Sequence, residues 1–196
     1  MQRSIGVNGL FPEGVFIEAT SGELSSSTGR YVKRLSELEA IFADRAAHAA
    51  AVKQGSDPIA YEVIEYRQIG SDIFFGTTIM HPGTVGREFY MTRGHFHERR
   101  DMGEIYYTQS GSGVLLLQSR DGVTRDVEMR PGVCAFIPPD WAHRSVNTGD
   151  EKLVFLWCCN QSAGHDYGDI LMRGMRKRVV KRVGGGFDIV PNSAHP

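Results

Sequence analysis

The amino-acid sequence predicts a single all-β domain, built as a sandwich or barrel, with an N-terminal helix and arm packed outside it. A chain of 196 residues can bury roughly 70% of the surface that its unfolded form exposes, which is enough for one core. Gly and Pro turn signals recur about every ten residues from Gly70 onward and separate short apolar stretches. From Ala60 onward apolar and polar side chains alternate, as is typical of strands.

Residues 1–55 are predicted to form the arm and the helix, and residues 56–196 the β domain with a C-terminal β segment. The arm, residues 1–30, is mixed in composition, and we expect one strand near 14–19. Residues 32–53 are predicted to be helical because apolar residues recur at helical spacing and an alanine-rich stretch follows them. These apolar residues are Val32, Leu35, Leu38, Ile41 and Phe42.

A capping pattern lies inside this predicted helix. Ser36, followed three residues later by Glu39, is a candidate capping box, in which case Val32 and Leu35 would precede the helix. Gly55 is expected to end it.

The β region opens with a strand at Ala60 whose side chains alternate between two faces. One face holds Tyr61, Val63, Glu65 and Arg67, and the other holds Glu62, Ile64 and Tyr66. The longest apolar run, Leu153–Cys159, predicts a buried strand. Near the end of the chain, Gly184–Gly186 predicts a hairpin in the final β segment.

The charges of the chain are nearly balanced. The sequence has 22 Lys and Arg against 23 Asp and Glu, a formal net charge of −1. We therefore expect no nucleic-acid partner, since nucleic-acid-binding domains are usually basic. The basic cluster Arg173–Arg182 is interpreted as an exposed strand or helix face, with a local anion or partner site as the alternative.

Apolar runs and cysteines bear on the compartment. No apolar run approaches the ~18 residues of a membrane helix, and the first residues lack the apolar core of a signal peptide. The sequence thus predicts a cytoplasmic protein with no membrane partner. Its three cysteines do not form a disulfide framework. Cys134, Cys158 and Cys159 are expected as reduced thiols in the core or lining a pocket.

The most informative segment contains two histidines at strand spacing. On a strand, His95 and His97 direct both imidazoles to one face, while Phe96 points to the other. This geometry suits two ligands of one metal ion. Glu104 can join them only if the polar stretch between His97 and Glu104 turns, and that stretch contains a glycine.

A second segment strengthens the metal interpretation. Arg130–His143 has the pattern of a turn, a buried strand, a Pro-rich turn and another histidine, His143. In an antiparallel barrel a strand some distance along the chain can supply the last ligand. Three His and one Glu form a mixed N/O site that suits Fe(II), Mn(II), Zn, Ni or Co. A closed structural zinc site more often uses Cys.

Two motifs resemble those of the cupin superfamily. The first is H-x-H-x6-E-x6-G, from His95 to Gly111, and the second is G-x5-P-x4-H-x3-N, from Gly132 to Asn147. There are three departures from the cupin pattern. The gap between the H-x-H pair and the Glu is longer than usual, Phe89 replaces the opening glycine, and Asp140 replaces a glycine of the second motif.

With these departures the sequence resembles one branch of the superfamily, the cupin-type phosphoglucose isomerases. The resemblance extends over residues 32–190, including the end of the predicted helix, and is most specific in three segments. They are Glu88–His97, Pro138–Arg144 and Ala163–Gly168. The resemblance implies a cupin jelly-roll fold and the interconversion of glucose 6-phosphate and fructose 6-phosphate, a step of glycolysis and gluconeogenesis. It also implies a homodimer.

The resemblance further implies a set of site residues. One divalent metal ion per chain, expected to be Fe(II), would be held by His95, His97, Glu104 and His143. The phosphate side of the pocket would be formed by Thr78, Thr92 and Gly94, and the sugar side by Tyr106, His165 and Tyr167. Glu104, Tyr106 and His165 are the expected catalytic residues. Cys159 stands where the family often has a tyrosine that helps to bind phosphate, which puts the exact substrate in question.

Aldose–ketose isomerisation fits these residue types. The reaction moves hydrogen between C1 and C2 of an open-chain sugar and needs an electrophile for the developing oxyanion. A metal with open positions is such an electrophile, and Glu104 is the candidate general base. A direct hydride shift is the competing mechanism, in which Glu104 is chiefly a ligand.

Other functions remain open at this point. One is a cupin isomerase for another sugar phosphate, and another is a metal cupin that binds sugar without turnover. A non-haem iron oxygenase is disfavoured because its facial triad has two His and one carboxylate, whereas His143 would be a fourth protein ligand. The remaining histidines, His48, His81 and His195, are expected to face solvent.

Overall fold

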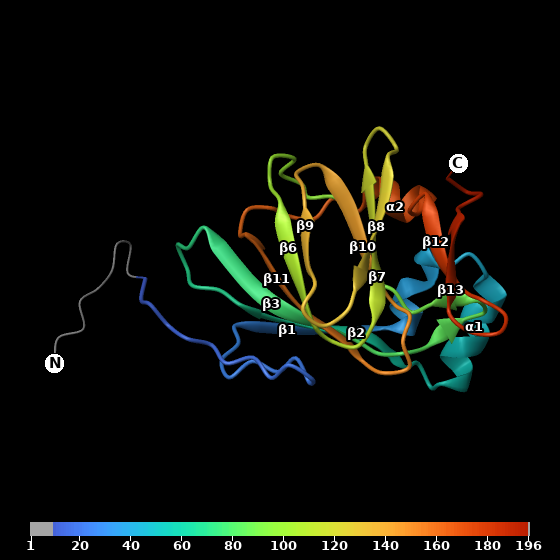
Figure 1. Ribbon diagram of the computed structural model, residues 1–196, viewed down its shortest axis with the longest axis horizontal. Helices are drawn as coiled ribbons and strands as arrows, with labels where there is room; N and C mark the ends of the chain where they lie inside the picture. The colour runs from blue at the N-terminus through green and yellow to red at the C-terminus, as the bar shows by residue number, and fades with distance from the viewer. Residues whose placement is uncertain (1–9, 196) are drawn as a thin grey trace.

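The computed structural model describes residues 10–195, within which the chain folds into three antiparallel sheets (Figure 1). The largest sheet has six strands in the order β1-β2-β3-β11-β6-β9. These strands are β1 (Gly29–Arg34), β2 (Ile59–Tyr66), β3 (Ile73–Met80), β11 (Leu153–Asn160), β6 (Glu104–Ser110) and β9 (Cys134–Ile137). The prediction of an all-β fold is confirmed, as is the buried strand at Leu153–Cys159.

Two smaller sheets complete the β structure. The first has the order β10-β7-β8 and consists of β10 (Trp141–Asn147), β7 (Gly113–Ser119) and β8 (Thr124–Met129). The second has the order β13-β12-β5-β4 and consists of β13 (Phe187–Pro191), β12 (Lys177–Lys181), β5 (Glu88–Phe89) and β4 (Thr84–Val85). The expected hairpin at Gly184–Gly186 joins β12 to β13.

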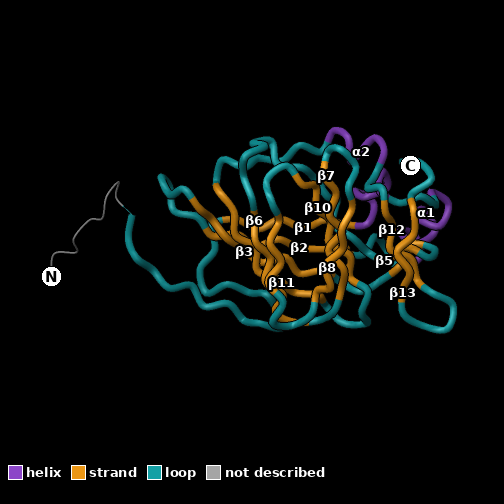
Figure 2. The backbone as a smooth tube through the Cα atoms, turned by 45° about the horizontal axis from the view of Figure 1, so that its top comes forward, coloured by secondary structure: helices purple, strands orange, loops and turns teal. Residues whose placement is uncertain are grey.

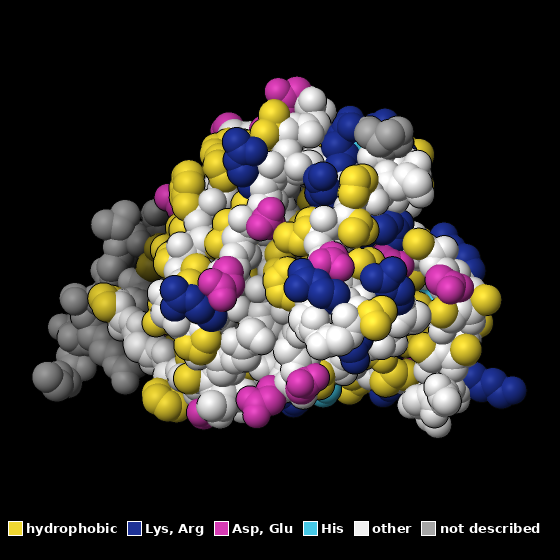
Figure 3. All heavy atoms as spheres, turned by 45° about the vertical axis from the view of Figure 1, so that its right-hand side comes forward, with side chains coloured by type: hydrophobic (Ala, Val, Ile, Leu, Met, Phe, Trp, Pro, Cys, Tyr) yellow, Lys and Arg dark blue, Asp and Glu magenta, His cyan; other side chains and the backbone are white. Residues whose placement is uncertain are grey.

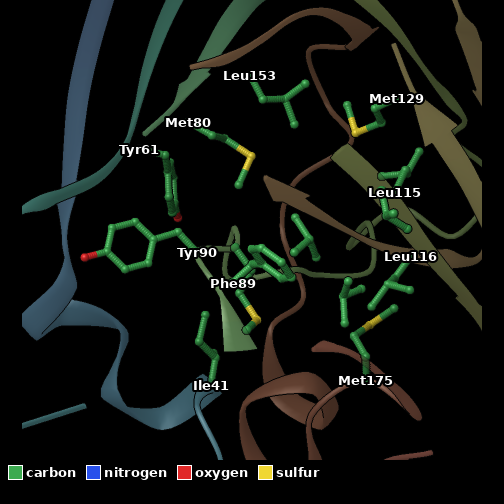
Figure 4. Packing of buried hydrophobic residues seen from close by; sticks show 14 of the residues in the cluster. Ile41, Tyr61, Met80, Phe89, Tyr90, Leu115, Leu116, Met129, Leu153 and Met175 are labelled. Carbon is green, nitrogen blue, oxygen red and sulfur yellow. The ribbon is translucent and has the colours of Figure 1, made fainter. Parts of the chain in front are cut away.

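The main core lies between the six-stranded and the three-stranded sheet. Figure 4 shows Met80 and Leu153 of the larger sheet around the same space as Leu115 and Met129 of the smaller one. All four side chains are at most 1% exposed. The two layers therefore form a sandwich whose interior is apolar over this region, as alternation along the strands requires.

The N-terminal region differs from the prediction. The expected strand near 14–19 is reduced to an isolated bridge between Ile17 and Leu24. The predicted helix over 32–53 is three elements: strand β1, a 3-10 helix over Leu35–Ile41, and the α-helix α1 (Arg45–Gln54). Strand β1 pairs along β2, so part of the predicted arm and helix is the edge of the main sheet.

The capping prediction is also wrong. Ser36 binds the carboxylate of Asp57, with its backbone N–H 2.9 Å from Oδ1 and its hydroxyl 2.8 Å from Oδ2. The cap of α1 is Asp44, whose carboxylate accepts a hydrogen bond from Ala47 N–H at 2.8 Å. Gly55 follows the last residue of α1, as expected. In the part of the chain that is described, no helix is long and apolar enough to cross a membrane.

The helices gather with the β12–β13 hairpin at one end of the molecule (Figure 2). A short helix, α2 (Gly168–Arg173), lies there too. The basic cluster 173–182 spans the end of α2 and β12, where its arginines pair with acidic residues: Arg173 with Asp169, Arg178 with Glu88, and Arg182 with Asp188. On the face in Figure 3, basic and acidic side chains are interspersed.

Predictions about three single side chains are wrong. His48 and His195 are 4% and 3% exposed, not solvent-facing, and each ring is hydrogen-bonded to a backbone carbonyl. His81 is half-buried beside Glu62. Cys134, predicted to lie in the core or to line a pocket, is an exposed free thiol, whereas Cys158 and Cys159 are partly buried.

Candidate metal centre and active site

An antiparallel bridge brings the first and last predicted ligands together. His95 and His143 exchange two backbone hydrogen bonds, from His95 N–H to His143 O at 3.3 Å and from His143 N–H to His95 O at 3.1 Å. Directly opposed residues project from the same face of a ladder, so the two imidazoles meet, with ring centroids 4.4 Å apart. His97 lies two residues on, at 5.7 Å from the His95 ring.

A second bridge adds the two predicted sugar-side residues. Phe96 and Asp166 pair through backbone hydrogen bonds of 3.0 and 2.8 Å, and Phe96 is buried in the core. Because side chains alternate along an extended segment, the neighbours His165 and Tyr167 face the side on which His95 lies. The His165 ring is 4.3 Å from the His95 ring and stacks on Tyr167 at 5.6 Å.

Glu104 completes the group from the six-stranded sheet. It begins β6 and is buried, paired with Ile137 of β9 and Cys159 of β11. Its Oε2 lies 3.3 Å from His97 Nε2 and 3.1 Å from His143 Nε2. The predicted set His95, His97, Glu104 and His143 thus offers four ligand atoms that all lie within 4.8 Å of one another.

The buried nitrogens fit a divalent cation. The Nδ1 atoms of His97 and His143 contact the carbonyl oxygens of Met102 at 2.9 Å and Trp141 at 3.3 Å, so both Nε2 atoms face the centre. Among the described residues, His143 Nε2 is a buried atom with no hydrogen bond, although it is close to Glu104. Such an atom is costly to bury unless something binds it. A metal ion would satisfy it.

The charges of the group lead to the same conclusion. Burial raises the pKa of Glu104, but the adjacent imidazoles of His143 and His97 outweigh burial and lower it to about 2. Burial, together with repulsion from His143 and His165, lowers the pKa of His95 well below its usual value. At neutral pH the centre therefore holds an ionised carboxylate beside the neutral imidazole of His95, as ligation of a divalent metal requires. Burial lowers the pKa of His97, but its hydrogen bonds to Glu104 and Met102 outweigh burial and raise it, so a bound metal ion would displace the proton that this pair shares.

These residues line one wall of a pocket whose ends differ. One end contains Thr78, Thr92, Arg93 and Gly94, with the tyrosines Tyr31 and Tyr61 beside them. The other end contains Glu65, Arg67, Phe74, Trp157 and Cys159. A Cβ on Gly76 would lie 2.5 Å from the Trp157 ring, so only glycine leaves room for the indole to lie on β3. Along the sheet, the register runs from Thr78 opposite Phe155, past Trp157 opposite Tyr106, to Cys159 opposite both Phe74 and Glu104. The pocket therefore has a hydroxyl-rich end and, opposite it, an end where aromatic residues lie beside the His/Glu group.

Comparison with known proteins identifies the family. A family model described as "Glucose-6-phosphate isomerase (GPI)" matches residues 32–191. The chain belongs to the glucose-6-phosphate isomerase family. It is 42% identical over 183 residues to a glucose-6-phosphate isomerase of Thermococcus onnurineus, covering 92% of this chain and 95% of that relative. It is 42% identical to one from Sinorhizobium medicae, covering 93% and 87%.

The family resemblance predicted from the motifs is confirmed, and the branch is the cupin type. Among solved structures, oxalate decarboxylase from Bacillus subtilis matches with a TM-score of 0.45 and 23% identity, covering 54% of this chain and 26% of that chain.

Every residue that the sequence predicted for the site of this family member lies at the same pocket. They are Thr78, Thr92, Gly94, His95, His97, Glu104, Tyr106, His143, His165 and Tyr167. Tyr106 is buried, packed edge-on against His143 and tilted against Phe155. Burial and the charge of Glu104 raise its pKa well above its usual value, so its hydroxyl keeps its proton.

Sequence reasoning missed several pocket residues. Tyr61, Glu65 and Arg67 were placed on one face of a strand, but nothing in the alternation indicated that this face lines a pocket. The sequence does not indicate that Tyr31 and Arg93 line the pocket, because their positions depend on pairing between strands that are distant in sequence. The Arg93 guanidinium lies 5.3 Å from the Tyr167 ring centroid, within cation–π distance.

Cys159 does not lie at the hydroxyl-rich end of the pocket, although the family resemblance places a phosphate-binding tyrosine at this position. It pairs with Glu104 across β11 and β6, while Phe155, four residues earlier, pairs with Thr78. At about 3.3 Å per residue, the Cys159 backbone is some 13 Å along the strand from that of Phe155. Burial and the nearby Glu104 charge raise the pKa of the Cys159 thiol, so it stays protonated.

Proposed function

We propose that this protein interconverts glucose 6-phosphate and fructose 6-phosphate. The observation that carries the proposal is a group of three His and one Glu that lines a pocket. The other end of this pocket offers hydroxyl and backbone N–H donors, from Thr78, Thr92 and Gly94. Membership of the glucose-6-phosphate isomerase family supports it. The activity belongs to glycolysis and gluconeogenesis, and we propose a cytoplasmic location on that basis.

The test of substrate class is a panel of sugar phosphates assayed at matched metal loading. Fructose 6-phosphate should give the highest kcat/KM. A higher value for another sugar phosphate would replace the assignment by an isomerase for that compound. The aromatic end with Arg67 and Cys159 is where such a difference would arise.

The hydroxyl-rich end is proposed to bind phosphate. Thr92 Oγ1 accepts a hydrogen bond from Ser145 N–H at 3.0 Å, so the hydroxyl proton of Thr92 is left to donate into the pocket. Thr78 lies on the pocket face of β3, and Gly94 contributes a backbone N–H. Neutral donors of this kind bind a phosphate dianion strongly, because hydrogen bonds to charged groups are the stronger ones.

The opposite end of the substrate, with C1 and C2, would then face the His/Glu group. His95, His97, Glu104 and His143 would hold one divalent ion, for which we propose Fe(II), with Mn, Zn, Ni and Co as alternatives. When bound, the ion supplies Lewis-acid polarisation of the sugar oxygens. Metal analysis of protein purified without chelator tests the ion's identity.

The chain's own groups handle the proton and the sugar hydroxyls. The Glu104 carboxylate is ionised and is the acceptor available to take a proton from carbon. His165 has its pKa lowered by burial, so its imidazole is neutral at pH 7 and can exchange a proton with a sugar oxygen. Tyr106 donates through its phenol. The competing route moves hydrogen directly between C1 and C2 and leaves Glu104 as a ligand.

Thr92→Val should weaken binding of the phosphate with little effect on chemistry. Val keeps the shape of Thr but lacks the donor, and a lost hydrogen bond to a charged group costs ~1.5–3 kcal/mol. We expect KM for fructose 6-phosphate to rise about tenfold to a hundredfold, measured by steady-state kinetics. The matched control is Thr77→Val, because the Thr77 hydroxyl bonds Gly22 O on the other face of β3. Equal KM values for both variants and the parent would contradict the phosphate assignment.

We also propose a homodimer. Ile105, Tyr107 and Phe136 are 38%, 41% and 68% exposed on the outer face of β6 and β9, and Ile105 pairs with Phe136 across the two strands. A contiguous exposed apolar patch of this kind marks an interaction surface. Sedimentation equilibrium measures the state directly.

A further inference from the structure

Arg144 is a buried cation behind the hydroxyl-rich end of the pocket. Its residue is 2% exposed, and it follows His143 on β10, so it points away from the face that carries the His143 imidazole. Its Nε and Nη2 donate to the carbonyl oxygen of Arg93 at 3.2 and 2.6 Å. A buried guanidinium is costly unless its charge is compensated.

Glu88 is the carboxylate whose charge acts on Arg144, but it already has other partners. Glu88 forms an ion pair with Arg178 and accepts a hydrogen bond from Ala43 N–H at 2.7 Å. Among residues 10–195, no ion pair joins Arg144 itself to a carboxylate. The positive charge is therefore balanced mainly by the carbonyl dipole of Arg93, which leaves its field available to an anion on the other side of that peptide.

The geometry of the Arg93–Gly94 peptide directs its other polar group into the pocket. The peptide is trans, so the C=O of Arg93 and the N–H of Gly94 point in opposite directions. The C=O points to the buried guanidinium, and Gly94 lines the pocket. Within the described part of the chain, no protein acceptor binds this N–H.

Gly94 is required for this arrangement. Its φ is +75°, a conformation that side chains with a Cβ rarely adopt, and a Cβ would lie 3.0 Å from Arg144 Nε. The segment is fixed on both sides by β10, through Thr92 N–H to Ser145 O at 2.9 Å and the His95–His143 bridge. Arg144 lies between these two attachments and holds the peptide in the middle.

We propose that Arg144 is a positioning residue for the substrate's phosphate: it holds the Arg93–Gly94 peptide with its N–H directed at the phosphate and places a cation behind that peptide. The guanidinium, carbonyl, N–H and phosphate then form one chain of hydrogen bonds in which each polarises the next. The inference rests on the proposed function, since it deepens the phosphate end of that site.

The experiment compares two ligands in three variants. The ligands are 5-phosphoarabinonate and arabinonate, which share a carboxylate end and differ in the phosphate. The variants are Arg144→Met, which removes charge and donors, Arg144→Lys, which keeps the charge but loses the two-pronged contact, and Arg87→Met. The last is the matched control, because Arg87 makes the same two-pronged contact, from Nε and Nη2 to the carbonyl oxygen of Lys181 at 3.2 and 3.1 Å, but does not line the pocket.

Arg144→Met should raise the dissociation constant of 5-phosphoarabinonate about tenfold or more and change that of arabinonate by no more than about twofold. Arg144→Lys should recover part of the loss, and Arg87→Met should leave the affinity for both ligands unchanged. KM for fructose 6-phosphate should rise in parallel while kcat changes less. Metal content is measured in every sample. If Arg144→Met does not fold, Arg144→Lys replaces it, and the ratio of its affinities for 5-phosphoarabinonate and arabinonate is compared with that of the parent.

Equal weakening of both ligands, or no weakening of either, overturns the role of Arg144. These outcomes are distinct from failure of the proposed function. A parent protein that turns over fructose 6-phosphate while its Arg144 variants keep the phosphate preference refutes this inference alone. A parent that prefers the phosphorylated ligand but shows no turnover refutes the isomerase assignment and leaves the inference standing. A parent without any phosphate preference refutes both.

Discussion

His143→Ala is expected to remove the metal ion and the isomerase activity together. His143 is 2% exposed and is attached by its backbone to His95, so its imidazole is held at the centre of the ligand group. Lewis-acid stabilisation by a bound metal is worth several kcal/mol, and each 1.36 kcal/mol is a factor of ten in rate. We therefore expect turnover of fructose 6-phosphate to fall by about 10³-fold or more.

The measurement is metal content and turnover on the same preparation. The control is His48→Ala, since His48 is also a buried histidine, 4% exposed, but bonds Leu35 O at 2.8 Å away from the pocket. That variant should lose stability and keep both the ion and the activity. A His143→Ala protein with one ion per chain and the parent's turnover would remove His143 from the centre.

Glu104→Gln should reduce turnover by about 10²–10⁴-fold if Glu104 takes the proton, because that is the usual contribution of a general base. Gln keeps the size and one oxygen that can bind a metal, but it cannot accept the proton. KM should change little, since the phosphate contacts lie at Thr92 and Gly94. The measurement is kcat on protein with its ion content determined.

The matched control is Glu65→Gln. Glu65 lines the same pocket but pairs with Arg67 at 2.9 Å and lies outside the ligand group, so its loss should change kcat only a few-fold. A Glu104→Gln protein that retains its ion and isomerises nearly as fast as the parent would exclude general-base catalysis. Direct hydride transfer between C1 and C2 would then be the mechanism.

The β part of the fold could be predicted because strand alternation is a local signal. The N-terminal error has a physical cause that the sequence already contains. Leu35, Leu38 and Ile41 recur every third residue, which is the period of a 3-10 helix and not that of an α-helix. Val32 matched the helical spacing only by coincidence, since it belongs to β1. The division of the chain at residue 55 stays a prediction.

The site was predictable where its residues are close in sequence and unpredictable where strand pairing creates it. His95 and His97 are two residues apart, and motif spacing added Glu104 and His143. Arg93 and Arg144 could not be found in this way, because their relation depends on a backbone carbonyl meeting a side chain from a strand far along the chain. The burial of His48 could not be predicted, because half of its helix is alanine and the helix shows little amphipathic pattern.

The metal dependence of turnover is tested by titrating metal-free protein with Fe(II) under anaerobic conditions, with turnover of fructose 6-phosphate and bound iron measured at each step. If the His/Glu group loaded with one divalent ion isomerises fructose 6-phosphate, turnover rises in proportion to bound iron and saturates at one ion per chain. Equal turnover by metal-free protein, or a fully loaded protein that binds fructose 6-phosphate without converting it under any divalent metal, would contradict this role of the group.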